Sequence, residues 1–362
     1  MMSKKVLFTA TVDSHILHFH LPYLKWFKEQ GYEVHVATNG DEEIPYCDVK
    51  HKISFERSPL KVNNLKAIKQ LKSIVNKEQF EIIHCHTPMG SVVTRIAAKE
   101  ARKKYGTKVI YTAHGFHFFK GAPIQNWFIF YPIEKWLSRY TDCLITINEE
   151  DYNLAKKRFH TKQIELVHGV GVDKEKFNFT MSEQEKHNLR VSIGLEDDDF
   201  VMIYPAELSK RKNQGMLLQV VKELKENGYQ NIKLLLPGLD SMKGKYQAMA
   251  KQLDVEKQVR FLDYRKDIPQ LMKISNLAVS VALQEGLPVN LIEAMMCDLP
   301  IVATDCRGNR DIVLDTVAIG KINDFKKEIK EVIETNKKNY KDSIEKYALN
   351  NVMKEYLKIY LA

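Results

Sequence analysis

The chain has few cysteines and no paired cysteine motif. The five that it contains are scattered, at Cys47, Cys85, Cys143, Cys297 and Cys306. A disulfide framework uses an even set of cysteines, and a structural zinc site uses close pairs such as C-x-x-C. Both are therefore disfavoured, and we expect the cysteines to be small buried apolar residues.

Long hydrophobic runs are also absent. No stretch approaches the roughly 20 apolar residues of a membrane-spanning helix. The opening residues, MMSKKVLFTATVDS, lead into a strand without a signal-peptide pattern. We therefore expect a cytoplasmic protein. With 362 residues, 44% of them hydrophobic and 28% charged, the composition is that of a globular chain with two domains.

Short β-rich runs alternate with amphipathic helical patterns along the whole chain. The strands predicted in the first half are Lys5–Thr11, Glu33–Thr38, Glu81–His86, Lys108–Ala113, Cys143–Ile147 and Gln163–Val167. After a turn-rich linker around residues 168–180 the predicted strands are Phe200–Pro205, Ile232–Pro237, Val259–Leu262, Leu277–Leu283, Pro300–Thr304 and Val317–Ile319. This α/β alternation predicts two Rossmann-like domains with parallel sheets, at 1–170 and 171–342. A helix at 343–362 is expected to pack back across the domain junction.

Basic residues are concentrated in the first half of the chain. Residues 1–170 contain 25 Lys and Arg against 17 Asp and Glu, whereas the rest of the chain is nearly balanced. Such an excess suits an anionic membrane surface or a phosphorylated acceptor, and a solvated lysine-rich surface is the alternative. No known nucleic-acid-binding motif is present, so a nucleic-acid partner is disfavoured.

The stretch Leu283–Pro300, LQEGLPVNLIEAMMCDLP, carries the strongest functional pattern. It is expected to form a tight turn and a helix after a buried strand, with Glu285 in the loop and Glu293 on the helix. In an open α/β sheet this edge binds ligands, and an ionised carboxylate accepts hydrogen bonds from sugar hydroxyls. From spacing alone, a ligand site and two ordinary surface glutamates are equally good interpretations.

A basic turn is expected beside this stretch. Lys210, Arg211 and Lys212 stand between a strand and a helix, where cations can hold a diphosphate, although a solvated basic loop is the alternative. The dinucleotide fingerprint G-x-G-x-x-G is missing from both halves, which disfavours a nicotinamide dehydrogenase.

Histidines follow three neighbouring strands of the first half. His114 ends one strand, His84 and His86 end another, and His15, His18 and His20 follow the first. An acid/base or sugar-hydroxyl role is possible for His114. The sequence has no H-x-x-x-H helical pair and no carboxylate-rich cluster near these positions, so we expect no metal site.

An aromatic segment, Phe116–Tyr140, follows His114. Such residues favour a membrane interface, yet core packing is the commoner explanation. Further along, the segment Asp305–Asp311, DCRGNRD, is expected to shape the site without reacting, because its arginines and aspartates can pair with one another.

Together these residues resemble the retaining family-4 glycosyltransferases of the GT-B fold, in particular the capsule and exopolysaccharide branch. The resemblance covers nearly the whole chain: the opening VLFTATVDSHILHFHLPYLKWFKEQGYEVHVATNG, then IIHCHTPMG, YTAHGFHFFKGAP, AELSKRKNQ, EGLPVNLIEAM and RGNRDIV. EGLPVNLIEAM matches the family's E-x(7)-E element, which is its most specific mark.

The resemblance implies a role for each matching position. Glu293 would hold the nucleotide ribose, Glu285 would contact the donor sugar, and His114 would lie beside that sugar. Lys212 with Arg211 would neutralise the diphosphate. Sugar or phosphate oxygens would meet the backbone N–H groups of the loop Gly286, Leu287, Pro288 and Val289, in which proline alone has no N–H. His15, His86 and His117 would lie on the acceptor side. Where the family often has an arginine, this chain has Glu207, so Arg211 would take over its work.

The resulting expectation is a retaining, metal-independent glycosyltransferase that needs no cofactor. It would move a sugar from a nucleotide-diphosphate sugar, UDP-linked by expectation, to a polyprenyl-diphosphate-linked saccharide, working as a peripheral protein at the inner face of the cell membrane. The donor-binding half would be the second and the acceptor-binding half the first. The alternatives are a sugar-nucleotide 2-epimerase of similar fold and a non-catalytic nucleotide-sugar-binding subunit.

Overall fold

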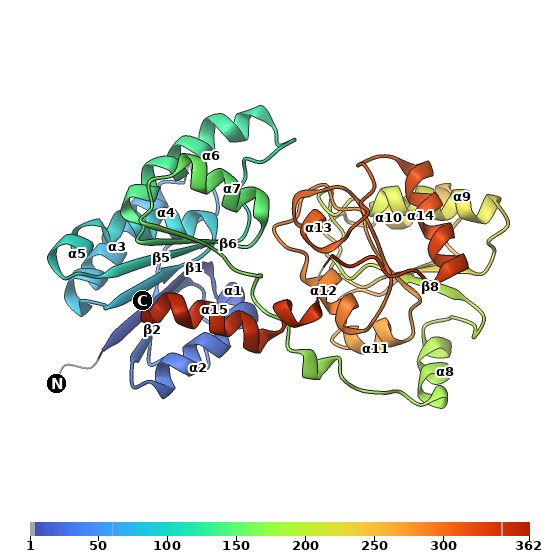
Figure 1. Cartoon of the computed structure of the whole chain (residues 1–362), viewed down its shortest axis with the longest axis horizontal. Coiled ribbons are helices and arrows are strands. Elements are labelled where there is room, and N and C mark those ends of the chain that lie inside the picture. Colours follow the sequence, from blue (N-terminus) through green and yellow to red (C-terminus); the bar gives the residue numbers. More distant parts are fainter. Residues whose placement is uncertain (1–3, 60, 342) are drawn as a thin grey trace. The chain divides into compact units, whose positions relative to one another are not determined.

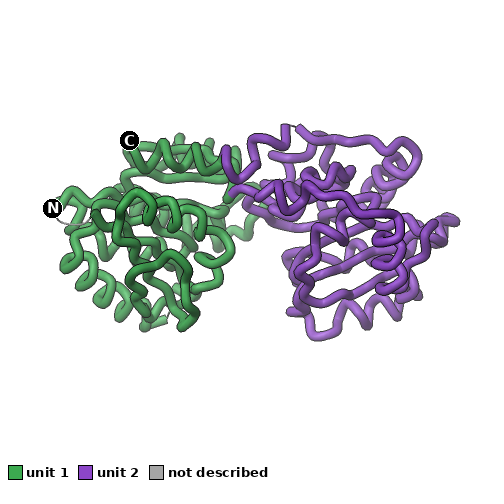
Figure 2. The backbone as a smooth tube through the Cα atoms, turned by 90° about the horizontal axis from the view of Figure 1, so that it is seen from below, with its two compact units in different colours: residues 1–170, 352–362 green, residues 171–351 purple. Residues whose placement is uncertain are grey.

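The computed structural model describes residues 4–59, 61–341 and 343–362. Its chain divides into two compact units (Figure 2). The first contains residues 1–170 and 352–362, and the second contains residues 171–351. Each unit is an α/β body around its own parallel sheet.

The first unit is built on a parallel sheet in the order β3-β2-β1-β4-β5-β6-β7. Its strands are β1 (Lys5–Val12), β2 (Glu33–Asn39), β3 (Val49–Lys52), β4 (Ile82–Cys85), β5 (Lys108–Ala113), β6 (Cys143–Thr146) and β7 (Gln163–Leu166). Successive side chains of a strand point to opposite faces of the sheet, so the continuous hydrophobic runs of these strands make both faces hydrophobic. Val6 and Phe8 of β1 enter one core and Leu7 enters the other.

Helices cover both faces of this sheet (Figure 1). They are α1 (Asp13–Phe19), α2 (Leu21–Glu29), α3 (Asn63–Glu78), α4 (Pro88–Ala97), α5 (Lys99–Lys104), α6 (Ile124–Leu137) and α7 (Glu149–Arg158). The last helix, α15 (Leu349–Leu361), lies on the face of α1 and α2, where Val352, Tyr356 and Tyr360 join their core. The tyrosines pack edge-on against aromatic rings of α2, which ties the end of the chain to the first unit.

The second unit has a smaller parallel sheet, in the order β10-β9-β8-β11-β12. Its strands are β8 (Phe200–Ile203), β9 (Ile232–Leu236), β10 (Val259–Phe261), β11 (Leu277–Ser280) and β12 (Ile301–Ala303). Its helices are α8 (Glu183–Ser192), α9 (Gln214–Glu226), α10 (Lys245–Gln252), α11 (Ile268–Lys273), α12 (Val289–Met296), α13 (Arg307–Ile312) and α14 (Ile322–Thr335). One core lies under α9, α10 and α14, and the other under α11 and α12.

The structure departs from the sequence prediction at several places. β3, with the sequence VKHK, was missed because an edge strand with polar residues shows no hydrophobic pattern. The amphipathic stretch from Leu17 to Gln30 does not form one continuous helix, because the backbone leaves helical geometry at His20, two residues before Pro22. The strand predicted at Val317–Ile319 is wrong, since only Val317 forms an isolated bridge, with Thr304.

Candidate active site

An ion pair joins the basic turn of the second unit to the loop after β11. Lys212 Nζ donates to Glu285 Oε1, and the side chains are 13% and 8% exposed. Arg211 is more exposed, and its Nη1 donates to the Gln284 carbonyl at 3.1 Å and lies 3.4 Å from Glu285 Oε2. Two cations and a carboxylate predicted from separate motifs therefore meet at the carboxyl edge of the sheet. The third cation of the turn, Lys210, is exposed.

The loop that follows Glu285 is held from behind by α13. The buried Arg307 donates from Nε to the Glu285 carbonyl at 3.1 Å. Gly308 lies so close to the loop that a Cβ there would come within 2.5 Å of the Gly286 carbonyl oxygen. The expectation that Asp305–Asp311 shapes the site agrees with these contacts. Arg310 also pairs with Asp305 at 3.2 Å, as expected for that segment.

Helix α12 begins at Val289, immediately after this loop. Pro288 is its N-cap, and no side chain caps the helix. The N-terminus of α12 therefore offers backbone N–H groups to a ligand oxygen. Glu293, one turn further on, is half-buried, and burial raises the pKa of Glu293 to about 7, although the charge of Lys176 opposes this.

The raised pKa of Glu293 predicts a pH-dependent stability. The folded chain holds this proton more tightly than the unfolded chain, so the free energy of unfolding falls as pH rises from about 4.5 to about 7. We expect Glu293→Gln to be more stable than the unchanged protein by about 2 kcal/mol at pH 8 and no more stable at pH 4. Urea unfolding at both pH values measures this difference.

A matched control for this prediction is Glu256→Gln, at an exposed position outside the site. It should not alter the pH dependence of stability. A Glu293→Gln variant whose stability follows that of the unchanged protein at every pH would contradict the proposed burial cost.

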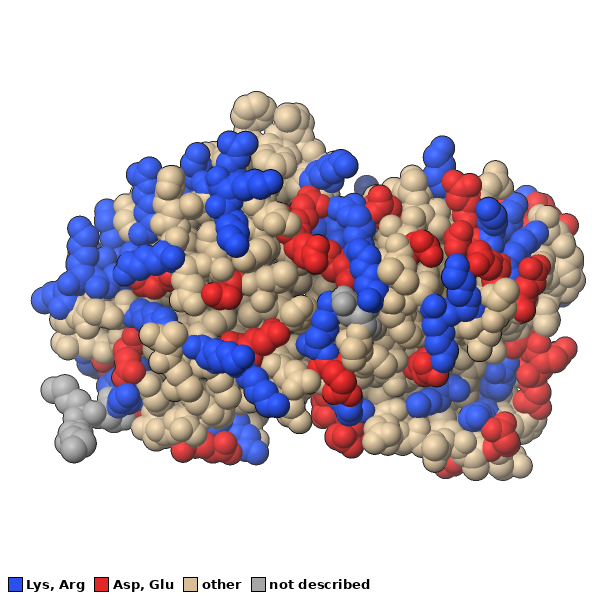
Figure 3. All heavy atoms as spheres, viewed as in Figure 1, with Lys and Arg blue, Asp and Glu red and all other residues tan. Residues whose placement is uncertain are grey.

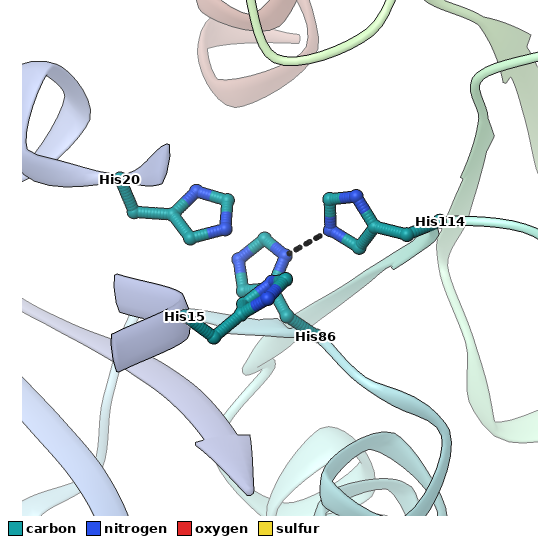
Figure 4. A group of neighbouring side chains, drawn as sticks. All are labelled: His15, His20, His86 and His114. Carbon is teal, nitrogen blue, oxygen red and sulfur yellow. Dashed lines mark hydrogen bonds between the residues drawn. The ribbon is translucent and has the colours of Figure 1, made fainter. Parts of the chain in front are cut away.

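The first unit gathers a histidine cluster at the carboxyl ends of its strands (Figure 4). The cluster is His15, His20, His86 and His114. They come from α1, from the break between α1 and α2, and from the ends of β4 and β5. Burial lowers the pKa of His114 to about 4 and lowers the pKa of the other three well below the usual value. The rings are thus neutral at neutral pH, so His114 suits hydrogen bonding to a sugar hydroxyl better than it suits a role as a charged acid.

A cavity of about 750 Å³ adjoins this cluster within the first unit. His15 and His117, two of the predicted acceptor-side residues, line it, whereas His86 does not. Its walls are largely apolar and aromatic, and Arg57 and Glu134 add charge. A ligand that combines polar and apolar parts fits such a lining.

Beneath the cavity lies a buried ion pair that no sequence pattern indicated. Arg95 and Glu134 are 1% and 7% exposed, and Arg95 Nη2 donates to Glu134 Oε2 at 2.8 Å. Tyr111 stacks on the Arg95 guanidinium and donates to Glu134 at 3.4 Å. The only signal in the sequence was a charged residue, Glu134, inside an aromatic segment. Because its partner Arg95 is 39 residues away, that signal did not indicate a pair.

The structure groups the predicted site residues into two sets. The donor-side residues Arg211, Lys212, Glu285, Gly286, Leu287, Pro288, Val289 and Glu293 all belong to the turn, loop and helix of the second unit. The residues His15, His86, His114 and His117 belong to the first unit. Among the described residues, Glu293 forms no ion pair or hydrogen bond that would hold it in place of a ligand.

Two family models match the chain, one in each half. Residues 5–148 match the model described as "Glycosyl transferase 4-like", and residues 185–351 match "Glycosyl transferases group 1". The second match contains the whole Lys212–Glu285 region.

Relatives with known names agree with these matches. EpsD of Bacillus subtilis, which is named as a glycosyltransferase, is 47% identical over 315 residues, covering 87% of this chain and 82% of EpsD. The UDP-Gal:alpha-D-GlcNAc-diphosphoundecaprenol alpha-1,3-galactosyltransferase of Escherichia coli is 27% identical over 268 residues, covering 70% of this chain and 67% of that enzyme.

A solved structure shows the fold. The crystal structure of Anabaena HepE in complex with UDP and glucose has a TM-score of 0.76 at 17% identity, covering 98% of this chain and 99% of HepE. The expected α/β class and the GT-B fold are thereby confirmed. This chain belongs to the family-4, or group 1, glycosyltransferases of the GT-B fold, in the branch that includes EpsD.

Proposed function

We propose that the chain transfers a sugar from a UDP-linked donor to a polyprenyl-diphosphate-linked saccharide during exopolysaccharide or capsule assembly. Transfer would proceed with retention of anomeric configuration and without a metal ion. The observation that carries this proposal is the set of Lys212, Arg211 and Glu285 next to the uncapped N-terminus of α12. The names of the E. coli galactosyltransferase and of the HepE complex support the lipid-diphosphate acceptor and UDP.

On the donor side, each group has a chemical task. Lys212 and Arg211 would neutralise the diphosphate, and the N-terminus of α12 adds its positive dipole end. Glu285 would accept hydrogen bonds from the donor sugar. Glu293, once deprotonated, would accept both ribose hydroxyls, and this predicts tighter donor binding above its pKa of about 7.

The reaction itself needs a stabilised leaving group. The acceptor oxygen bonds to the anomeric carbon while the bond from that carbon to the phosphate oxygen breaks, and its electron pair leaves with UDP. The acceptor proton passes to the departing phosphate on the same face, because no carboxylate stands out as a nucleophile. Fixed cations that meet this growing charge lower the barrier without a metal.

The acceptor would enter the cavity of the first unit. Its apolar and aromatic walls suit the first isoprene units and the faces of a sugar, while His15 and His117 suit hydroxyl groups. His114 would lie beside the donor sugar at the rim of this region.

A nucleotide-release assay with a panel of sugar nucleotides tests the proposal. With undecaprenyl-diphosphate-linked saccharide as acceptor, a UDP-sugar is expected to support product formation, and EDTA is expected to leave the rate unchanged. A ligand of the folded state also raises the melting temperature, which identifies the donor independently. Binding without nucleotide release for every acceptor would favour the non-catalytic subunit, and formation of an epimerised sugar nucleotide would favour the epimerase.

The proposal places the protein at an anionic membrane surface. No helix among the described residues is long and apolar enough to span a bilayer. Helix α6 nevertheless exposes apolar side chains to solvent, with Phe128 76% and Ile124 63% exposed. Lysine and arginine side chains gather over the part of the first unit that carries α3 and α5 (Figure 3). Apolar anchors together with basic residues are typical of peripheral binding.

Vesicle binding tests the membrane part of the proposal. We expect the protein to bind anionic vesicles at low salt, and the double variant Ile124→Ser with Phe128→Ser to bind roughly tenfold more weakly because two apolar anchors are lost. Sedimentation with vesicles measures the bound fraction. Val191→Ser is the matched control, since Val191 is also exposed, at 57%, but lies in the second unit. Equal binding by all three proteins would exclude α6 as the anchor.

A further inference from the structure

The histidine cluster holds more unused hydrogen-bonding capacity than the proposed transfer reaction requires. Among the described residues, Nε2 of His15, His20 and His86 is buried without any hydrogen-bond partner. An unpartnered buried polar atom costs free energy, so three of them side by side indicate a missing ligand. The neighbouring His84 shows the contrast, since Tyr360 and Thr112 engage its two ring nitrogens at 2.7 and 2.8 Å.

The four rings converge on one point of the fold. One nitrogen from each ring lies within 4.8 Å of a nitrogen of every other ring. In Figure 4 the rings of His20 and His114 approach from opposite sides, and those of His15 and His86 lie between them. His86 Nδ1 and His114 Nε2 are 3.4 Å apart, and the His20 and His86 rings stack with centroids 3.8 Å apart.

We propose that the histidine cluster is a binding site for a zinc ion. Tetrahedral zinc holds imidazole nitrogens about 2.0–2.1 Å away, so its ligands stand roughly 3.3 Å apart. The rings need to move inward by only about 1 Å. In the stacked pair, His20 and His86, one ring must also turn about its side-chain bonds so that the nitrogens of both rings point at the ion. The ligands follow three different strands, β1, β4 and β5, which explains why no metal motif is visible in the sequence.

The chemistry of the donor set restricts the metal to the later first-row ions, and among these zinc favours a tetrahedral site. All four ligands are imidazoles, which suit zinc, cobalt, nickel and copper, whereas magnesium and manganese prefer carboxylate and carbonyl oxygens.

A second group among the described residues that could hold a metal ion, Glu33, His35 and Glu78, lacks this free capacity. His35 engages Glu33 at 2.7 Å and His51 at 2.9 Å through its two ring nitrogens. Glu78, the third member of that group, pairs with Lys5 at 2.6 Å. A metal ion would have to displace all of these contacts, and His51 therefore provides a matched control position.

A consequence for activity rests on the proposed function. Zinc held by His114 and His15 would occupy nitrogens that the sugar substrates need, so bound zinc would slow transfer. The binding site itself does not depend on that function, because a metal titration needs neither donor nor acceptor.

Metal titration of the full chain, free of any histidine tag, tests the proposal. We expect one Co²⁺ per chain with the strong visible absorption of a tetrahedral site, displacement of that absorption by Zn²⁺, and no effect of Mg²⁺. His15→Gln and His114→Gln should each weaken zinc binding at least tenfold in calorimetry, and His51→Gln should leave it unchanged. Circular dichroism verifies that each variant is folded. If His114→Gln does not fold, the zinc affinity of His15→Gln tests the proposal, because His15 is partly exposed and its replacement disturbs the core less.

The proposal would be overturned by the absence of a tetrahedral Co²⁺ spectrum, by unchanged zinc affinity in His15→Gln, or by loss of binding in His51→Gln instead. Inhibition of transfer by zinc without stoichiometric binding would also contradict it, since it would indicate an effect on the substrates.

Discussion

Replacing Lys212 with alanine is expected to lower kcat by a factor of about 100 to 1,000, which is the usual cost of losing one fixed group that stabilises developing charge. Lys212 is mostly buried and already paired with Glu285, so its ammonium group is held in place before the donor arrives. The departing UDP gains negative charge as the glycosidic bond breaks, and a pre-positioned cation stabilises it without reorganisation. Steady-state kinetics with the UDP-sugar identified by the donor panel measure the effect.

Two controls separate this role from general charge loss. Lys210→Ala removes a cation from the same turn. Because Lys210 is exposed to solvent, the kcat of this variant should remain within a factor of about two of that of the unchanged enzyme. Glu285→Ala combined with Lys212→Ala tests whether the two act as one unit, in which case the double variant loses little more than the single one. If Lys212→Ala raised KM and left kcat unchanged, Lys212 would bind the donor without favouring the transition state.

Replacing Arg95 with methionine is expected to destabilise the protein by about 3–5 kcal/mol, because it leaves the Glu134 carboxylate buried without a cation. The pair is almost fully enclosed, and Arg95 also donates to the Ser91 carbonyl and hydroxyl, both at 3.1 Å. The guanidinium stacks on the Tyr111 ring, with 4.2 Å from Cζ to the ring centroid. Urea unfolding at neutral pH, followed by circular dichroism, measures the loss.

The double variant Arg95→Met with Glu134→Leu shows whether the cost comes from the stranded charge. With both charged groups replaced by apolar side chains of similar size, most of the stability should return, since desolvation and attraction nearly cancel in a buried pair. If the two substitutions had additive costs, the packing of the side chains would be responsible instead. Glu134 also borders the cavity. If the double variant regains stability, its KM for the acceptor shows whether this carboxylate contributes to acceptor binding.

Much of the fold was predictable because the strands are strongly hydrophobic and regularly spaced. The predicted strands at Lys108–Ala113 and Glu33–Thr38 differ from β5 and β2 by at most one residue. The missed elements carry weak patterns. Helix α8 has a capping box, Ser182 with Glu185, but its face is polar, and α13 is only six residues long.

The site was partly predictable for a related reason. Lys212 and Glu285 each belong to a recognisable local motif, and parallel strands bring their carboxyl ends to one edge, so their proximity across 73 residues follows from topology. The segment that contains Arg307 was expected to shape the site, but the contact of Arg307 with the Glu285 carbonyl and the buried Arg95–Glu134 pair were not predictable, because each depends on which side chains are enclosed.

The sequence by itself determined the two parallel sheets, the loop with Glu285 and the basic turn with Lys212, because hydrophobic periodicity and turn residues are local properties. Only the tertiary structure decided which charges are buried and which histidines meet. His15 and His20 follow β1, His86 follows β4 and His114 follows β5. The unpartnered nitrogens of His15, His20 and His86 come together only once these strands lie side by side. Burial and partnership are properties of packing between distant segments, and no local pattern encodes them.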